Sequence, residues 1–143
     1  MMTVVERFLK YVGFDTQSDE NSGESPSTGK QKILGAALAE ELSALGLHNA
    51  HMDEHGYVYG WLPASPGCEG IPCVGLIAHM DTSPDAPGEG VKPRIVRYEG
   101  GDLVLNQEKG IVMRAAEFES LGRYVGQELI VTDGTTLLGA DDK

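Results

Sequence analysis

The sequence predicts an α/β fold, in which one amphipathic helix packs against a sheet that contains a buried central strand. Apolar residues at helical spacing indicate the helix, which ends near Gly46: Ile33, Leu34, Leu38, Leu42 and Leu45. A nearly continuous apolar run over residues 73–78 indicates the strand, because a strand buried on both faces needs apolar side chains at every position. With 143 residues, the chain is long enough for one compact domain or part of one.

Other elements are predicted before the central strand. A short first helix that ends near Gly13 is indicated by apolar residues at helical spacing: Val4, Val5, Phe8, Leu9 and Val12. A polar loop rich in Ser, Gly and Pro follows over residues 15–30, and Thr28 with Gln31 fits a capping box that would start the longer helix. Residues 51–62 then predict a hairpin, because their aromatic and β-branched composition suits strands.

The pattern is less regular after the central strand. Residues 82–93 contain three prolines and two glycines, so they form a loop that leaves the end of that strand. Residues 115–121 suit one or two turns of helix, and residues 128–132 suit a strand. A tight turn at Asp133-Gly134 would then lead into a further strand at 135–138.

Composition narrows the class of ligand. A formal charge of −11 argues against nucleic-acid phosphates and against an anionic membrane surface as partners. The first 12 residues carry charges among their apolar side chains, unlike a secretory signal, and no apolar run approaches the length of a membrane span. We therefore expect a cytoplasmic protein with reduced cysteines that acts on small molecules or peptides.

Two groups of residues that could bind a metal ion follow the predicted strands. In extended backbone His79 and Asp81 project to the same side, so that a carboxylate lies beside an imidazole, as it does around many zinc-bound histidines. Asp141 follows the strand at 135–138. Each feature alone is also explained by a solvated strand end. Together they favour a metal site, because imidazole nitrogen and carboxylate oxygen suit zinc and α/β sheets bind ligands at strand ends.

The segments around these residues resemble longer motifs of a known protein family. Residues 77–85 and 132–143 closely resemble two motifs of the peptidase T family, and residues 14–18 and 26–28 are similar to its N-terminal segment. The resemblance implies a three-layer zinc-exopeptidase-like catalytic domain with a mixed sheet. It also implies a zinc-dependent aminopeptidase that releases the N-terminal residue from tripeptides. In that role His79 would bind one zinc ion, Asp141 would bridge two, and Asp81 would support His79.

The same resemblance implies that residues 1–143 are the N-terminal part of the catalytic domain. The family's general base and its remaining metal ligands would lie beyond Lys143, so we expect the chain alone to be inactive and to self-associate through an uncovered sheet. We also expect His79 and Asp141 to converge, with Asp81 within hydrogen-bonding reach of the His79 ring. The resemblance further implies a cis peptide bond at Asp141-Asp142.

Other functions remain open from the sequence. A carboxypeptidase, aminoacylase or desuccinylase of the same superfamily would keep His79, Asp81 and Asp141, and a non-catalytic binding relative would keep the fold alone. A phosphate-binding loop at Gly23 to Lys30 is disfavoured, because its spacing is one residue too long and Gln31 stands where a Ser or Thr should bind magnesium.

Overall fold

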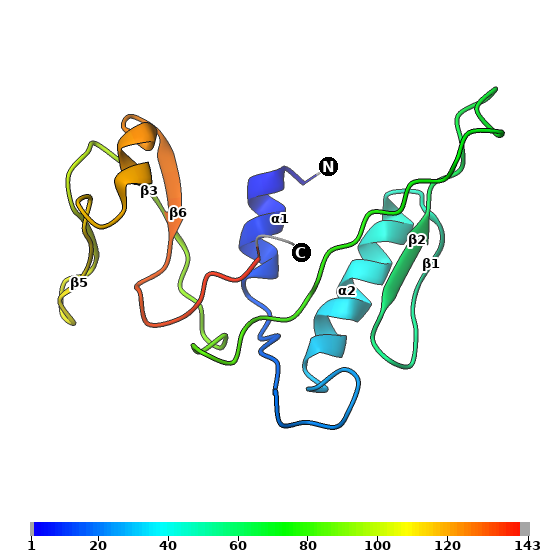
Figure 1. Ribbon diagram of the computed structural model, residues 1–143, viewed down its shortest axis with the longest axis horizontal. Helices are drawn as coiled ribbons and strands as arrows, with labels where there is room; N and C mark the ends of the chain where they lie inside the picture. Colours follow the sequence, from blue (N-terminus) through cyan, green and yellow to red (C-terminus); the bar gives the residue numbers. More distant parts are fainter. Residues whose placement is uncertain (1, 141–143) are drawn as a thin grey trace.

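The computed structural model of the protein describes residues 2–140. In these residues two α-helices, α1 (Val4–Tyr11) and α2 (Gln31–Ala44), come first and are followed by five short strands, the short 3-10 helix η1 (Glu119–Tyr124) and a sixth strand. Figure 1 shows α1 in the middle, α2 with the first hairpin on one side of it, and the remaining strands on the other side. None of the helices in the described part of the chain is long and apolar enough to cross a membrane.

The strands form three separate antiparallel pairs within residues 2–140. In the first pair, β1 (His48–Met52) lies beside β2 (Val58–Trp61), as the sequence predicts. In the second, β3 (Arg94–Arg97) lies beside β6 (Glu128–Val131), of which only β6 was expected. The third pair, β4 (Leu103–Asn106) with β5 (Ile111–Met113), was not expected. The mixture of helices and small sheets agrees with the predicted α/β class.

The prediction of a central strand at 74–78 is wrong for this structure. Residues 73–81 lie in no helix or strand. The side chains of Val74, Leu76 and Ile77 are exposed, at 80%, 95% and 99%. A strand requires a neighbouring strand to accept and donate its backbone hydrogen bonds, and none of the described strands lies against this run. For the same reason, residues 135–138 do not form the predicted strand.

The first helix carries the capping box. The Thr3 side chain accepts a hydrogen bond from the Glu6 backbone N–H, and the Glu6 carboxylate accepts one from the Thr3 backbone N–H. The box predicted at Thr28 is absent, because α2 begins after Lys30 without a side-chain cap. Thr28 instead donates its hydroxyl to the backbone oxygen of Gln17, at 2.8 Å.

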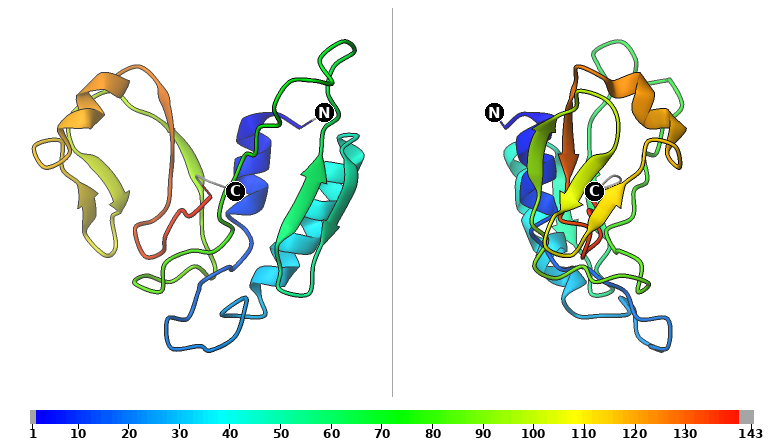
Figure 2. Two further views of the ribbon diagram at one scale, coloured as in Figure 1. Left: turned by 45° about the vertical axis from the view of Figure 1, so that its right-hand side comes forward. Right: turned by 90° about the vertical axis from the view of Figure 1, so that its left-hand side faces the viewer.

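A small apolar core lies where the two helices meet the loops. Tyr11, Val12, Leu34 and Ala140 are buried in it, although they come from distant parts of the sequence. Figure 2 shows the segment that ends at residue 140 passing close to α1. Partly buried apolar residues surround the four: Phe8, Phe14, Leu38, Met80, Val91 and Leu138. The core therefore joins α1 and α2 to the loop between residues 80 and 91 and to the segment that ends at residue 140.

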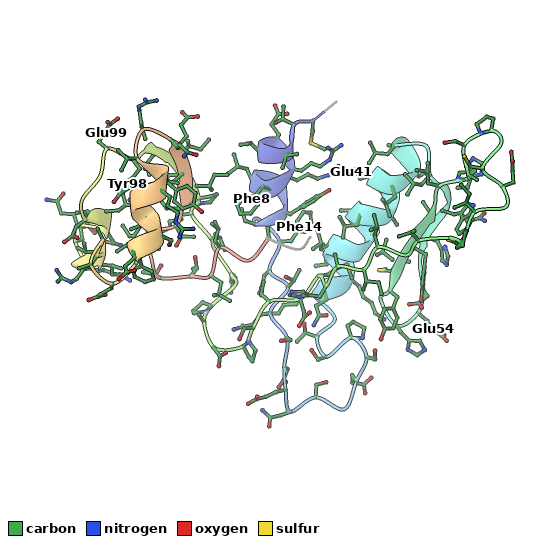
Figure 3. The ribbon with its side chains drawn as sticks, turned by 45° about the horizontal axis from the view of Figure 1, so that its top comes forward. Phe8, Phe14, Glu41, Glu54, Tyr98 and Glu99 are labelled. Atoms are coloured by element: carbon green, nitrogen blue, oxygen red, sulfur yellow. The ribbon has the colours of Figure 1, made fainter. Side chains whose placement is uncertain are left out.

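An ion-pair cluster also joins the two helices. The Glu41 carboxylate of α2 accepts hydrogen bonds from Lys10 Nζ, at 2.8 Å, and from Arg7 Nε, at 2.5 Å, both on α1. Figure 3 shows Glu41 on the side of α2 that faces α1. The Lys10 ammonium, together with Arg7 and Tyr11, lowers the pKa of Glu41 to about 2, against the opposing effect of burial. Glu41 is therefore a carboxylate at neutral pH, and it holds the helices together.

Candidate functional site

His79 and Asp81 lie side by side at the end of the exposed apolar run. His79 Nδ1 is 3.2 Å from Asp81 Oδ1, so the hydrogen-bonding contact expected from the sequence is present. Both side chains are open to solvent, with 61% and 42% of their surfaces exposed. The contact forms without a strand, because it requires only extended backbone, in which residues two apart project to one side. With Nδ1 facing the carboxylate, Nε2 is the ring nitrogen suited to a metal ion.

These residues border a cleft of about 410 Å³. Its walls come from α1, from the loop that begins at residue 79, and from the segment that leads to residue 140. The lining residues are Phe8, His79, Asp81, Thr82, Ser83, Leu137, Leu138, Gly139 and Ala140. The structure thus brings the two motif segments together at one site, as far as Ala140. Asp141 and the Asp141-Asp142 bond lie outside the described residues.

Gly139 allows the two segments to approach closely. A Cβ atom at this position would lie 2.5 Å from Thr82 Cγ2, which is shorter than any van der Waals contact between carbon atoms. The backbone φ of Gly139 is also positive, at 45°, in the region that favours glycine. The proximity of Thr82 therefore requires a residue without a side chain at position 139.

The residues of the cleft fit part of a zinc site. His79 offers an imidazole, and Asp81 is placed to orient it, which is the usual arrangement around a zinc-bound histidine. Within residues 2–140, however, no three His, Cys, Asp or Glu side chains are grouped closely enough to hold an ion. Tetrahedral zinc takes four ligands. Among the described residues of the cleft, His79 is therefore a candidate for one ligand, with the Asp81 carboxylate beside it.

Sequence patterns did not identify several residues around the site. Phe8 belongs to the apolar stripe that predicted α1, and it also lines the cleft. Thr82 and Gln17 pair through an isolated parallel bridge that links the loop after Asp81 to the loop after α1. The only signal for this pairing was the similarity of residues 14–18 to the family's N-terminal segment, because bridges between loops have no periodic pattern.

Comparison with known proteins shows that the chain is similar to peptidase T from several bacteria. Peptidase T of Caldanaerobacter subterraneus subsp. tengcongensis is 56% identical over 144 aligned residues, which cover all of this chain. Peptidase T of Parabacteroides distasonis is 54% identical over 99% of the chain, and that of Clostridium acetobutylicum is 54% identical over all of it. The resemblance to peptidase T is confirmed. No protein-family model matches the chain.

The similarity covers the whole of this chain but only part of each relative. The chain spans about 35% of the length of these curated peptidase T relatives. The aligned region covers the chain from end to end, so the segments that contain His79, Asp81 and the acidic residues after Gly139 lie within it.

Proposed function

We propose that this chain forms part of a zinc-dependent aminopeptidase that releases the N-terminal residue from tripeptides. The similarity to peptidase T along the whole chain supports a peptidase. The observation that carries the proposal to particular residues is the contact between His79 and Asp81 at the border of the cleft. The proposed activity is that of the whole protein, since the chain corresponds to about 35% of the length of its peptidase T relatives.

His79, Asp81 and Asp141 each have one role in this proposal. His79 would hold a zinc ion through Nε2, and Asp81 would accept a hydrogen bond from Nδ1–H, which would fix the tautomer and the orientation of the ring. Asp141 would be the residue that holds both ions. When bound, such a pair of ions polarises the attacked carbonyl group and lowers the pKa of a water molecule. The general base and the remaining metal ligands of this proposal are not assigned to residues of this chain.

The site also fits a small substrate. The cleft of about 410 Å³ has a volume typical of sites for small ligands. Its wall combines the apolar side chains of Phe8, Leu137 and Leu138 with the polar pair at one end. An extended peptide could place its carbonyl group near His79 while an apolar side chain contacts Phe8. A net charge of −11 is compatible with a substrate that carries a free amino group.

A chimera would test the proposal. The chain would replace the matching segment of the Caldanaerobacter peptidase T, to which it is 56% identical, and the intact relative would be assayed beside it. The chimera is expected to release the N-terminal residue of tripeptides, to lose this activity on chelation and to regain it with zinc. His79→Ala should abolish hydrolysis, and Asp81→Asn should lower zinc affinity or kcat about 10- to 100-fold.

One variant serves as the control, and two outcomes would contradict the proposal. Glu89→Gln removes an exposed carboxylate from the same loop and should leave activity unchanged. Preferential hydrolysis of N-acylated substrates would favour the aminoacylase, desuccinylase or carboxypeptidase alternatives. A folded chimera without hydrolysis, beside an active intact relative, would contradict the peptidase proposal and favour a non-catalytic binding protein.

A further inference from the structure

Thr82, the residue after Asp81, is held by the loop that follows α1. Its backbone N–H donates to Thr16 O at 3.1 Å, and its backbone oxygen accepts from the Ser18 N–H at 2.9 Å and from the Ser18 hydroxyl at 3.0 Å. Thr16 and Thr82 are both buried. Both backbone groups of Thr82 are therefore fixed at the point where the chain leaves the His79 and Asp81 pair.

Gln17 extends this hold to the rest of the loop. Its side-chain amide donates to the backbone oxygens of Pro84, at 3.3 Å, and Ala86, at 3.0 Å. Gln17 is itself fixed, because its N–H donates to Asp15 Oδ1 at 3.1 Å and its backbone oxygen accepts from Thr28. Asp15 in turn forms an ion pair with Lys30, next to the start of α2, at 2.8 Å. The loop after Asp81 is thus connected to α2 through residues 15–18.

The Thr82 side chain fills the space between two further segments. A Cβ atom at Gly88 would lie 3.0 Å from Thr82 Oγ1, and one at Gly139 would lie 2.5 Å from Thr82 Cγ2. The Leu137 N–H also donates to Pro87 O, at 2.9 Å. Thr82 Oγ1 is buried and has no hydrogen-bond partner among the described residues. The side chain therefore acts here by its shape rather than by its hydroxyl group.

We propose that residues 15–18 and Thr82 form a positioning clip, which sets the distance between the His79 and Asp81 pair and the segment that ends at Gly139-Ala140. Resting on the proposed function, the clip would align the two halves of the metal site, since His79 lies three residues before Thr82 and Asp141 lies two residues after Gly139. Metal sites require their ligands to be placed within about 0.5 Å, so a small movement of Thr82 would weaken binding. Gln17 and Thr82 are thus positioning residues.

A matched pair of variants separates shape from hydrogen bonding. Thr82→Val keeps both branches at Cβ, whereas Thr82→Ser removes Cγ2 and keeps the hydroxyl group. In the chimera, Thr82→Ser is expected to weaken zinc binding about tenfold and to lower kcat similarly, with little change in KM. Thr82→Val should lose less than Thr82→Ser on both measures. Zinc affinity is measured by competition with a chromophoric chelator, which does not depend on turnover.

Gly139→Ala tests the segment that contacts the Thr82 side chain, and Gln17→Ala tests the loop after α1 that belongs to the clip. Gly139→Ala displaces Thr82 and should weaken zinc binding at least as much as Thr82→Ser. A role in stability alone would lower the melting temperature of these variants but leave the zinc affinity of the folded protein unchanged, and this result would overturn the proposal. A greater loss in Thr82→Val than in Thr82→Ser would overturn it as well, because the hydroxyl group would then be the important feature.

Amide hydrogen exchange of the 143-residue chain tests the clip without any metal. The Thr82 amide should be protected, and Gln17→Ala should increase its exchange rate about tenfold, whereas Glu89→Gln should not. Rapid exchange of this amide in the unmodified chain would overturn the clip, whatever the chimera does. An inactive chimera in which the Thr82 amide is protected would contradict the proposed function but support the clip.

Discussion

Two apolar stretches of this chain differ in burial, because α2 buries one side of the helix whereas residues 73–78 are all exposed. Leu34 of α2 is fully buried, whereas Leu76 and Ile77 are almost fully exposed. A helix satisfies its own backbone hydrogen bonds and needs only one apolar face to pack. An extended segment cannot do so, and its burial depends on strands at its sides. Apolar composition alone therefore does not determine where a segment lies, because the source of its backbone hydrogen bonds also matters.

The largest expected effect tests this difference directly. Leu34→Ala should lower the free energy of unfolding by about 3 kcal/mol, because it leaves a cavity between α1 and α2. Leu76→Ala should change it by less than about 0.5 kcal/mol, because this side chain contacts mainly water. Urea denaturation followed by circular dichroism measures both. Similar losses in the two variants would show that residues 73–78 are buried in solution.

The exposed stretch should also make the chain self-associate. Exposed apolar side chains beside unpaired backbone favour contact with a second copy, and burying Leu76 would contribute about 2 kcal/mol. Leu76→Ser should therefore weaken association about 30-fold in sedimentation equilibrium. Added salt should strengthen it by screening the charge of −11. Val104→Ser, which changes a half-exposed residue of β4, serves as the control, and a monomer at all concentrations would contradict this expectation.

A smaller effect concerns the ion pairs between α1 and α2. Glu41 has a folded-state pKa of about 2, below its ordinary 4.5, so its carboxylate stabilises the fold above pH 4.5. This contribution is lost as the pH falls from 4.5 towards 2. Glu41→Gln should cost about 1 to 2 kcal/mol at pH 7 and almost nothing near pH 2. Glu40→Gln changes an exposed neighbour and serves as the control.

The smallest expected effect is local to α1. Thr3→Ala removes the capping interaction with the Glu6 backbone N–H and should cost about 1 kcal/mol. Glu6→Gln should cost less, because glutamine can accept the same hydrogen bond from the Thr3 N–H. Thermal unfolding of the three proteins at pH 7 measures the difference. Equal stability of all three would show that α1 is held only by its packing and by Glu41.

Sequence patterns predicted the elements that are defined locally. The apolar spacing of residues 33–45 and the composition of residues 57–61 correspond to α2 and to the first hairpin, because helices and tight hairpins depend on nearby residues. The peptidase T resemblance was also correct, and the contact of His79 with Asp81 followed from backbone geometry alone. Spacing misplaced the capping box, since Thr3 and Glu6 fit the same motif as Thr28 and Gln31.

The remaining features depend on long-range contacts. Residues 73–78 have the composition of a buried strand, but no pattern within them shows whether a partner strand is available. The pairing of β3 with β6 joins segments separated by some thirty residues, and the Gln17 and Thr82 bridge joins two loops. No periodic signal marks such pairings. The proposed positions of His79 and Asp141 around zinc likewise depend on contacts that the described residues only partly contain.

The bridge between Gln17 and Thr82 has a consequence for the order of folding. Ser18 and Thr82 are 64 residues apart, so their contact closes a long loop, and the entropy lost on closure must be offset by contacts that already exist. The hairpin of β1 and β2 packs on α2 within a single stretch of 31 to 61, which requires only short loops. We therefore expect this unit to form early and the bridge to form late. The geometry around His79 would then be acquired at the end of folding and lost at the start of unfolding.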